Sequence, residues 1–366
     1  MKRAVGVLAA VALLGGVAFA LLRPSDDPGG SPGQKVVTVT GVIGSEKRDF
    51  FEDPDVKAEL AKQGIKVSAQ TTGSWLMGDS KLDQLDFAFP ASLSPAEEIR
   101  RQLQLKDAPI RPFYSPLVVL AHQATAEVLE KNEVASRDKA TGVWTLRMDA
   151  YLNLVKAGKR WEDLGGAAGN SDLRGAVFMT TTDPAESSSG ALYLAVTSYV
   201  LNGHQVVSSG PEVDQVKPVL RALTAKQGIQ GSSSDQPFKD FLTNVGNPLV
   251  LAYESQAAQL ATAGKSTGDM TVLYPDTTVS SDHTVVGRTE AGRKLAGLLR
   301  DDEVLRRLEA KYGFRPQADP SAFAKQVGER KGPPAFAPDL AAAQVKQAPV
   351  PAPDLLAKLI DAAKGK

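Results

Sequence analysis

The chain has 366 residues, which is enough for two lobes that each bury an apolar core. Acidic and basic residues balance at 42 each, so no overall field directs the chain to nucleic acid or to acidic lipid. The absence of cysteine excludes disulfides, cysteine-ligated metal centres, thiol nucleophiles and lipid attachment to an N-terminal cysteine. The three histidines lie far apart and show none of the spacings of a metal motif, so we expect no metal site and no cofactor.

The N-terminus has the pattern of an export signal. Lys2 and Arg3 precede an uncharged apolar run at residues 4–22, which is also about long enough to span a bilayer. Residues 1–23 are therefore expected to be either a cleaved signal peptide or an uncleaved membrane anchor. Residues 24–35 are rich in Pro, Gly and Asp and are expected to form a flexible linker. The protein is thus expected to be extracytoplasmic, either anchored in the membrane by residues 4–22 or secreted.

Strands and helices alternate along the rest of the chain. Runs rich in β-branched and aromatic residues predict strands at residues 35–43, 65–71, 85–89, 112–122, 175–181, 248–253, 270–274 and 283–286. Apolar residues at helical spacing predict helices that begin near residues 53, 94, 149, 188, 213, 235, 254, 289, 301 and 354, with Ser94 as one N-cap. This alternation indicates a mostly parallel sheet covered by helices, whose ligand-binding edge lies at the carboxyl ends of the strands.

One stretch combines these features most clearly. The predicted strand at residues 175–181 is followed by Asp183-Pro184, by three serines at 187–189, and then by a helix. A helix N-terminus presents free backbone N–H groups and holds anions and other acceptors well. An ordinary capped helix is the alternative interpretation of this stretch.

No convincing catalytic pattern is present. Gly264-Lys265-Ser266-Thr267 looks like the end of a phosphate-binding loop, but Gln259 stands where that motif needs a glycine. Ser188 is not in a nucleophile elbow, because Glu186 stands two positions before it. The chain is therefore not expected to be an enzyme, and no catalytic residue is assigned.

The order of these pieces resembles bacterial extracellular solute-binding proteins of the type II periplasmic class, and is most similar to the molybdate, sulfate and phosphate binders. The likeness covers roughly residues 36–330. It rests on short motifs at residues 39–45, 72–74, 182–193, 251–256 and 308–316. The run Ser45-Glu46-Lys47-Arg48 departs from the pattern, because oxyanion binders often have small neutral residues there.

The resemblance implies an α/β, two-lobed type II periplasmic binding protein fold with a hinge and an inter-lobe cleft. The expected parts are lobe 1 at residues 36–119 and 278–330, lobe 2 at residues 120–277, chain crossings near 117–122 and 277–283, and a Pro/Ala-rich tail with a short helix at 331–366. A solute would lie between the lobes, and closure would sequester it.

The expected ligand-binding residues are hydroxyl and glycine positions at the ends of predicted strands. They are Ser45, Gly73 and Ser74 from lobe 1, and Ser188, Ser189, Gly190 and Tyr253 from lobe 2. Their hydroxyl and backbone N–H groups would donate to the oxygens of a small-molecule or anion ligand. The resemblance also implies a membrane transporter as partner and gives no role to nucleic acid.

Two other classes stay open. Residues 351–360 resemble the linker that joins such a module to a von Willebrand A domain, so a protein-interaction module working with a von Willebrand A partner is one alternative. The other is an enzyme on a similar scaffold. Porphobilinogen deaminase shares the lobe type, but it needs a cofactor-bearing cysteine, and this chain has none.

Overall fold

The computed structural model describes residues 36–330 and 332–365. The predicted signal peptide or anchor at residues 1–23 and the predicted linker at 24–35 lie outside the described residues. From Val37 onward the chain forms one compact unit. Among the described helices, none is both long enough and apolar enough to cross a bilayer.

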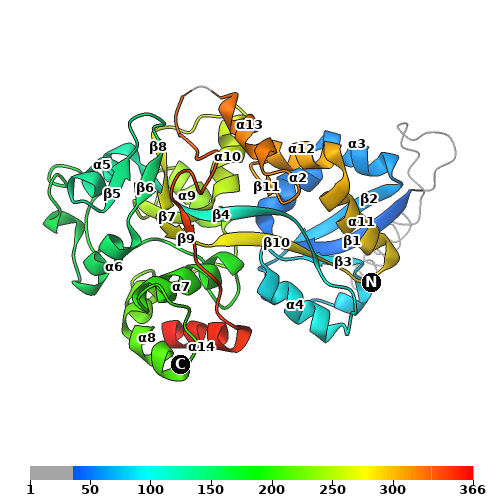
Figure 1. The fold of residues 1–366 in the computed structure, drawn as a ribbon, viewed down its shortest axis with the longest axis horizontal. Coiled ribbons are helices and arrows are strands. Elements are labelled where there is room, and N and C mark those ends of the chain that lie inside the picture. The colour runs from blue at the N-terminus through cyan, green and yellow to red at the C-terminus, as the bar shows by residue number, and fades with distance from the viewer. Residues whose placement is uncertain (1–35, 331, 366) are drawn as a thin grey trace, which may run out of the picture. The chain divides into compact units, whose positions relative to one another are not determined.

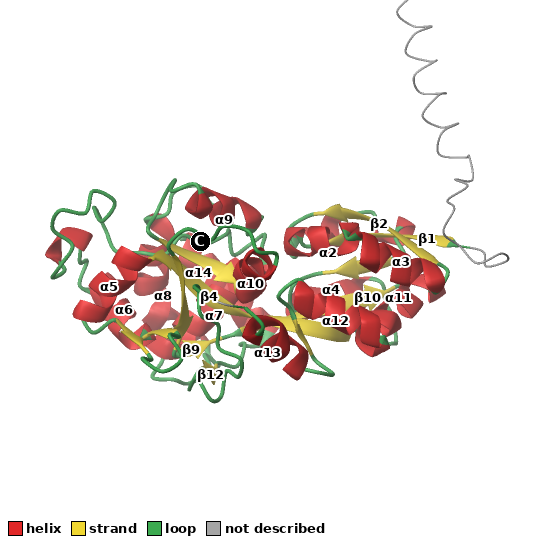
Figure 2. Ribbon diagram, turned by 90° about the horizontal axis from the view of Figure 1, so that it is seen from above, coloured by secondary structure: helices red, strands yellow, loops and turns green. Residues whose placement is uncertain are grey.

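Lobe 1 is built on parallel strands. They are β1 (Val37–Ile43), β2 (Ile65–Thr71) and β3 (Phe87–Phe89), with β10 (Ser280–Gly287) antiparallel to β3. Figure 2 shows the helices gathered around these strands: α2 (Arg48–Glu52), α3 (Pro54–Lys62), α4 (Leu93–Gln102), α11 (Glu290–Asp301) and α12 (Glu303–Lys311). The predicted start of α3 is confirmed, because the Asp53 side chain accepts from the backbone N–H groups of Asp55 and Val56, and Pro54 follows it.

Lobe 2 contains a second group of strands. They are β7 (Leu249–Tyr253) and β8 (Met270–Pro275), β6 (Trp144–Leu146) parallel to β8, and β5 (Ala135–Arg137) antiparallel to β6. Its helices are α5 (Gln123–Lys131), α6 (Met148–Lys156), α7 (Ser188–Leu201), α8 (Gly210–Ala225), α9 (Asp235–Leu242) and α10 (Glu254–Thr262). Helix α7 is buried along nearly its whole length, so it forms the centre of this lobe rather than its surface.

Two strands connect the lobes. Strand β4 (Ile110–His122) pairs with β10 through its first part and with β7 and β8 from Leu117 onward. Strand β10 returns from lobe 2 to lobe 1 after the short strand β9 (Thr277–Thr278). Figure 1 shows both long strands running between the two halves. The chain therefore runs between the two halves along β4 and β10, while the lobe boundaries and the crossings near 117–122 and 277–283 stay a prediction.

The C-terminal part of the chain passes along both lobes. After β11 (Arg315–Pro316), which pairs with β4, and α13 (Ser321–Gly328), it reaches β12 (Lys346–Gln347), which pairs in parallel with β9. Helix α14 (Pro353–Lys364) then packs against α8 and α7, as the red helix beside them in Figure 1 shows. The Pro/Ala-rich composition of this segment gave no sign of such docking.

One predicted N-cap and one predicted strand are wrong. Helix α4 begins at Leu93 with Ser92 at the N-cap position, and Ser94 lies inside the helix. Residues 175–181 form isolated bridges at Ala176 and Thr180 rather than a strand. Side chains take the backbone groups that a ladder would use, since Gln227 Oε1 accepts from the backbone N–H of Thr181 at 2.6 Å.

Candidate functional site

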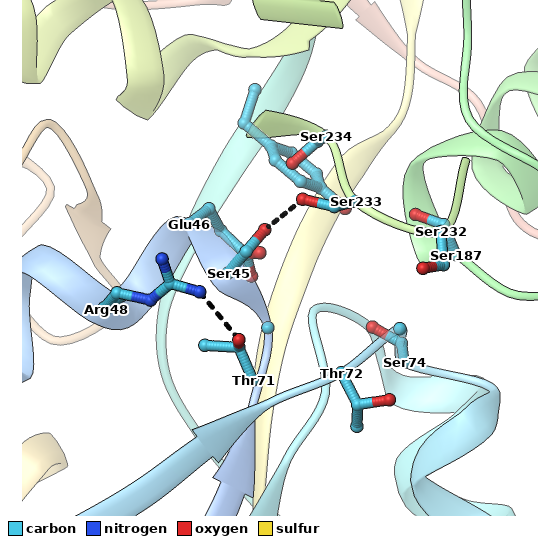
Figure 3. A pocket seen from close by; sticks show the side chains of 13 residues that line it. Ser45, Glu46, Arg48, Thr71, Thr72, Ser74, Ser187, Ser232, Ser233 and Ser234 are labelled. Atoms are coloured by element: carbon cyan, nitrogen blue, oxygen red, sulfur yellow. Dashed lines mark hydrogen bonds between the residues drawn. The ribbon is translucent and has the colours of Figure 1, made fainter. Parts of the chain in front are cut away.

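A cavity of about 150 Å³ lies where loops of the two lobes face each other. Its lining residues are Gly44, Ser45, Glu46, Arg48, Thr71, Thr72, Gly73 and Ser74 from lobe 1, and Ser187, Ser232, Ser233, Ser234 and Tyr253 from lobe 2 (Figure 3). Most of these residues carry a hydroxyl group, which can both donate and accept hydrogen bonds. The wall therefore suits a small ligand rich in oxygen atoms.

Lobe 1 contributes the loops that follow β1 and β2. These strands are parallel and adjacent, so their carboxyl ends meet at the same edge of the sheet. The backbone N–H of Thr72 donates to the carbonyl of Ile43 at 3.1 Å, which ties the two loops together. Arg48 Nη2 donates to Thr71 Oγ1 at 2.7 Å, as the dashed line in Figure 3 marks, and holds the guanidinium beside the cavity.

Lobe 2 contributes the loop before α9, the start of α7 and the end of β7. In the loop before α9, Ser233 Oγ accepts from the backbone N–H of Asp235 at 3.2 Å. The neighbouring Ser234 is only 4% exposed, and its hydroxyl has no hydrogen-bond partner. A buried hydroxyl without a partner costs free energy, so this group is available for a bound molecule.

The lobes touch each other around the cavity. Ser45 Oγ lies 2.9 Å from Ser233 Oγ across the cleft (Figure 3). The backbone N–H of Trp75 donates to the carbonyl of Glu186 at 3.1 Å. A Cβ atom on Gly73 would stand 2.5 Å from that same carbonyl oxygen, so only glycine permits this approach. The structure thus shows the lobes in contact.

The structure brings four of the seven expected site residues to the cavity wall: Ser45, Gly73, Ser74 and Tyr253. The other three, Ser188, Ser189 and Gly190, do not line it, because they lie behind the wall in the buried first turn of α7. Ser188 Oγ lies 2.7 Å from Ser92 Oγ of lobe 1, and Ser189 Oγ lies 2.7 Å from Thr182 Oγ1. The role of all seven in binding stays a prediction.

Several lining residues were not among those predicted from the sequence. Ser232, Ser233 and Ser234 precede the helix predicted near residue 235 and were not assigned to the site, although three successive hydroxyls before a helix resemble the loop at Ser187. Ser187 is itself the N-cap residue of α7, but its hydroxyl bonds to Ser189 Oγ at 3.0 Å rather than capping the helix backbone. The repeated pattern of hydroxyl residues at a helix start was the signal that could have identified this second loop.

A buried charge cluster lies beneath the cavity. Lys47 Nζ donates to Glu46, and it lies 3.1 Å from Nδ1 of His283 on β10. Lys47 and His283 are fully buried, and the Glu46 side chain is 4% exposed. Because an ammonium group has only donors, Nδ1 of His283 acts as the acceptor. The cluster ties the loop after β1 to a strand that connects the lobes.

The electrostatics of this cluster leave Glu46 ionised. Burial alone would raise the pKa of Glu46, but the charge of Lys47 holds that pKa well below its usual range. Burial, followed by the charge of Lys47, lowers the pKa of His283 to about 4, so this ring is neutral at neutral pH. With the exposed Arg48 at the rim, the cavity and the cluster beneath it hold two cations and one anion.

A second cavity of about 140 Å³ adjoins the first and shares Ser45, Glu46 and Arg48 with it. Its remaining wall carries acidic and basic side chains together with apolar and amide groups of α9 and α10. Across the described residues, no group of three or more His, Asp or Glu side chains is placed to hold a metal ion.

No family model matches the sequence, and no curated protein matches it. Solved structures match the fold. The sulfate-binding protein SubI from Mycobacterium tuberculosis H37Rv aligns with a TM-score of 0.52 at 14% identity, over 81% of this chain and 92% of that protein. A periplasmic thiamin-binding protein aligns with a TM-score of 0.56 at 12% identity, over 92% and 98% of the two chains.

The periplasmic binding protein AfuA from Actinobacillus pleuropneumoniae, with fructose 6-phosphate bound, aligns with a TM-score of 0.58 at 12% identity, over 88% of this chain and 96% of that protein. The chain therefore has the mixed α/β fold of the type II periplasmic solute-binding proteins, with two lobes, a hinge and a cleft between them. At these identities the likeness shows the fold, and any solute has to be argued from the site.

Proposed function

We propose that this chain is an extracytoplasmic solute-binding protein that captures a small polar solute, with an oxyanion as the first candidate, between its lobes for transport or sensing. The observation that carries the proposal is the cavity lined by hydroxyl groups from both lobes. The unpartnered hydroxyl of Ser234 supports it, because a solute oxygen would satisfy that buried group.

Size and charge favour an anion of few atoms. The cavity volume of about 150 Å³ is roughly half the lower limit of ~300 Å³ for pockets that hold drug-sized ligands. Lys47 compensates the charge of Glu46, and Arg48 adds a further cation at the rim. A small anion would therefore meet hydroxyl donors, with the cation of Arg48 at the rim.

The compared proteins support a solute-binding role without fixing the solute. Two of them are described with anionic ligands, sulfate and fructose 6-phosphate, and one with thiamin. The same fold thus accommodates ligands of different chemistry, and its loops decide which one is bound. We infer from the expected export signal that a membrane transporter or a sensor protein receives the solute.

A thermal-shift screen tests the proposal. Sulfate, phosphate, molybdate, sugars, amino acids and divalent metals are each added to the chain without its first 35 residues. A solute at 100 times its dissociation constant should stabilise the protein by about 2.7 kcal/mol, which is a clear rise in melting temperature. The matched controls are Ser234→Ala at the cavity and Ser198→Ala in α7, a buried serine whose hydroxyl bonds to the carbonyl of Ala195 instead.

The proposal expects at least one anion to stabilise the parent and Ser198→Ala, with a smaller shift for Ser234→Ala. If no solute in the panel raises the melting temperature, the chain does not act by capturing such a solute. The protein-interaction module with a von Willebrand A partner would then be the better account. Cell fractionation tests the proposed localisation. The protein with residues 1–35 present should be found outside the cytoplasm, and a soluble cytoplasmic protein would contradict that part of the proposal.

A further inference from the structure

The C-terminal segment is attached to both lobes before it reaches α14. Arg315 on β11, beside the lobe 1 part of β4, donates through Nη1 to the carbonyl of Pro338 at 3.0 Å and through Nη2 to that of Ala337 at 2.5 Å. The backbone N–H of Ala337 in turn donates to Tyr274 Oη on β8 of lobe 2 at 3.0 Å. One short piece of chain thus joins groups from the two lobes.

The segment next follows the crossing between the lobes. Strand β12 pairs with β9, and the backbone N–H of Ala348 donates to the carbonyl of Thr278 at 2.7 Å. Ser280 Oγ, at the start of β10, donates to Gln347 Oε1 at 2.8 Å. The C-terminal segment therefore adds a strand to the connection that has to bend when the lobes move.

Two leucines of helix α14 are buried in different apolar clusters. Leu359 packs within lobe 2, in a cluster with Val213, Val216 and Leu220 of α8. Leu356 forms a separate cluster with Ala191 and Ala195 of α7, and Trp75 of lobe 1 packs against this cluster. Both leucines are almost completely buried, at 0% and 1% exposure. Only the Leu356 cluster reaches the other lobe.

Trp75 links this cluster to the cavity. It directly follows Ser74 in the loop that forms the lobe 1 wall, and its backbone N–H bonds to Glu186 of lobe 2. Its indole Nε1 is buried without a partner, so apolar packing rather than a side-chain hydrogen bond holds the ring. On the lobe 2 side, Lys364 at the end of α14 forms an ion pair with Asp183, in the loop that leads to Ser187.

We propose that residues 335–364 form a strap that stabilises the closed arrangement of the lobes, with Leu356 as a positioning residue for the cavity wall through Trp75. Leu356 is the largest side chain of the cluster that Trp75 packs against. Its removal should let the loop at Gly73 and Ser74 leave lobe 2 more readily. The consequence for solute affinity rests on the proposed function, whereas the effect on closure does not.

The test measures closure in the absence of any solute. Because the chain has no cysteine, Lys66→Cys on β2 and Lys139→Cys in lobe 2, both exposed positions, allow specific attachment of two dyes. Single-molecule energy transfer then gives the ratio of closed to open molecules. Leu356→Ala and Leu359→Ala are the matched pair, since each removes the same atoms from the same buried helix.

The strap predicts that Leu356→Ala lowers the closed-to-open ratio by roughly tenfold or more, while Leu359→Ala leaves it within about twofold of the parent. Trp75→Ala should open the lobes as Leu356→Ala does, and Trp75→Phe should restore closure because it keeps an aromatic ring without the unpartnered N–H. If Leu356→Ala and Leu359→Ala have equal closed-to-open ratios, whether or not these differ from the ratio of the parent, the proposed role of the strap is wrong. This result needs no solute, so it is independent of the outcome of the solute screen.

Discussion

Replacement of Lys47 by methionine should destabilise the protein far more than the loss of an ordinary surface lysine. Lys47 is fully buried and forms an ion pair with Glu46, whose side chain is 4% exposed. Without the ammonium group, Glu46 would be left as a buried charge without a cation, which costs about 3–5 kcal/mol. This is a large part of the 5–15 kcal/mol that typically holds a domain together.

Urea unfolding followed by circular dichroism measures the loss. Lys57→Met is the control, because Lys57 pairs with Glu52 where both side chains are more than half exposed, and such pairs contribute about 0–1 kcal/mol. The double variant Lys47→Met with Glu46→Gln removes both charges and should recover much of the stability. Equal losses for Lys47→Met and Lys57→Met, or a double variant no more stable than Lys47→Met, would refute the reasoning.

Three further predictions follow from the site. His283 has a pKa of about 4 in the folded protein, which is below its ordinary value of 6.5. As the pH falls below 6.5, the unfolded chain therefore binds the proton before the folded protein does, and the free energy of unfolding decreases. The loss should be roughly 1.5 kcal/mol between pH 6.5 and pH 5 by urea unfolding, and His283→Asn should show a smaller slope. Gly190→Ala should cost about 1–3 kcal/mol, because its Cβ would lie 2.4 Å from the carbonyl oxygen of Thr182. Gly297 lies within α11 with open space around it, so Gly297→Ala should instead stabilise the protein by about 0.5–1 kcal/mol. Equal melting temperatures for Gly190→Ala and Gly297→Ala would contradict the predicted clash at Gly190. Ser234→Ala should not lower the melting temperature, because it removes a buried hydroxyl that has no partner, and should weaken solute binding roughly tenfold in calorimetric titration. A stability loss without an affinity loss would exclude a role in binding.

The strand-end positions of the site could be predicted from the sequence. The strands predicted at 35–43 and 65–71 are followed closely by Ser45 and by Gly73-Ser74, and a buried apolar run ends at Tyr253. Carboxyl ends of such strands meet at one edge of a sheet, and the structure places these residues around one cavity. The apolar patterns of the strands, with the rule that ligands bind at the carboxyl ends of parallel strands, were sufficient to predict these positions.

The orientation of α7 could not be predicted in the same way. Its residues are apolar or small on all sides, because the helix is buried almost completely, so no polar face shows which serine points outward. The sequence therefore favoured Ser188, Ser189 and Gly190, whereas Ser187 lines the cavity. A cavity wall set by tertiary packing leaves no periodic signal in a single helix.

Contacts between distant parts of the chain were also hidden. The charged run Ser45-Glu46-Lys47-Arg48 was noted only as a departure from the pattern of oxyanion binders, because His283, the partner of Lys47, lies 236 residues away. The composition of residues 331–366 predicted a Pro/Ala-rich tail with a short helix, yet Leu356 and Leu359 of that helix are almost completely buried. The composition of a segment indicates its local conformation, whereas the burial of these side chains depends on contacts with distant parts of the chain.

A reversible lock across the cleft tests the central claim, that a solute is held between the lobes, most directly. Ser92 Oγ of lobe 1 and Ser188 Oγ of lobe 2 lie 2.7 Å apart, both side chains are buried, and neither lines the cavity. Cysteines at these two positions are close enough for a disulfide, and the chain has no other cysteine to compete. In calorimetric titration with the solute that stabilises the parent, the account predicts that the empty, oxidised Ser92→Cys/Ser188→Cys variant takes up none and that reduction restores binding. Uptake by the oxidised variant with the affinity of the parent would contradict a solute site between the lobes.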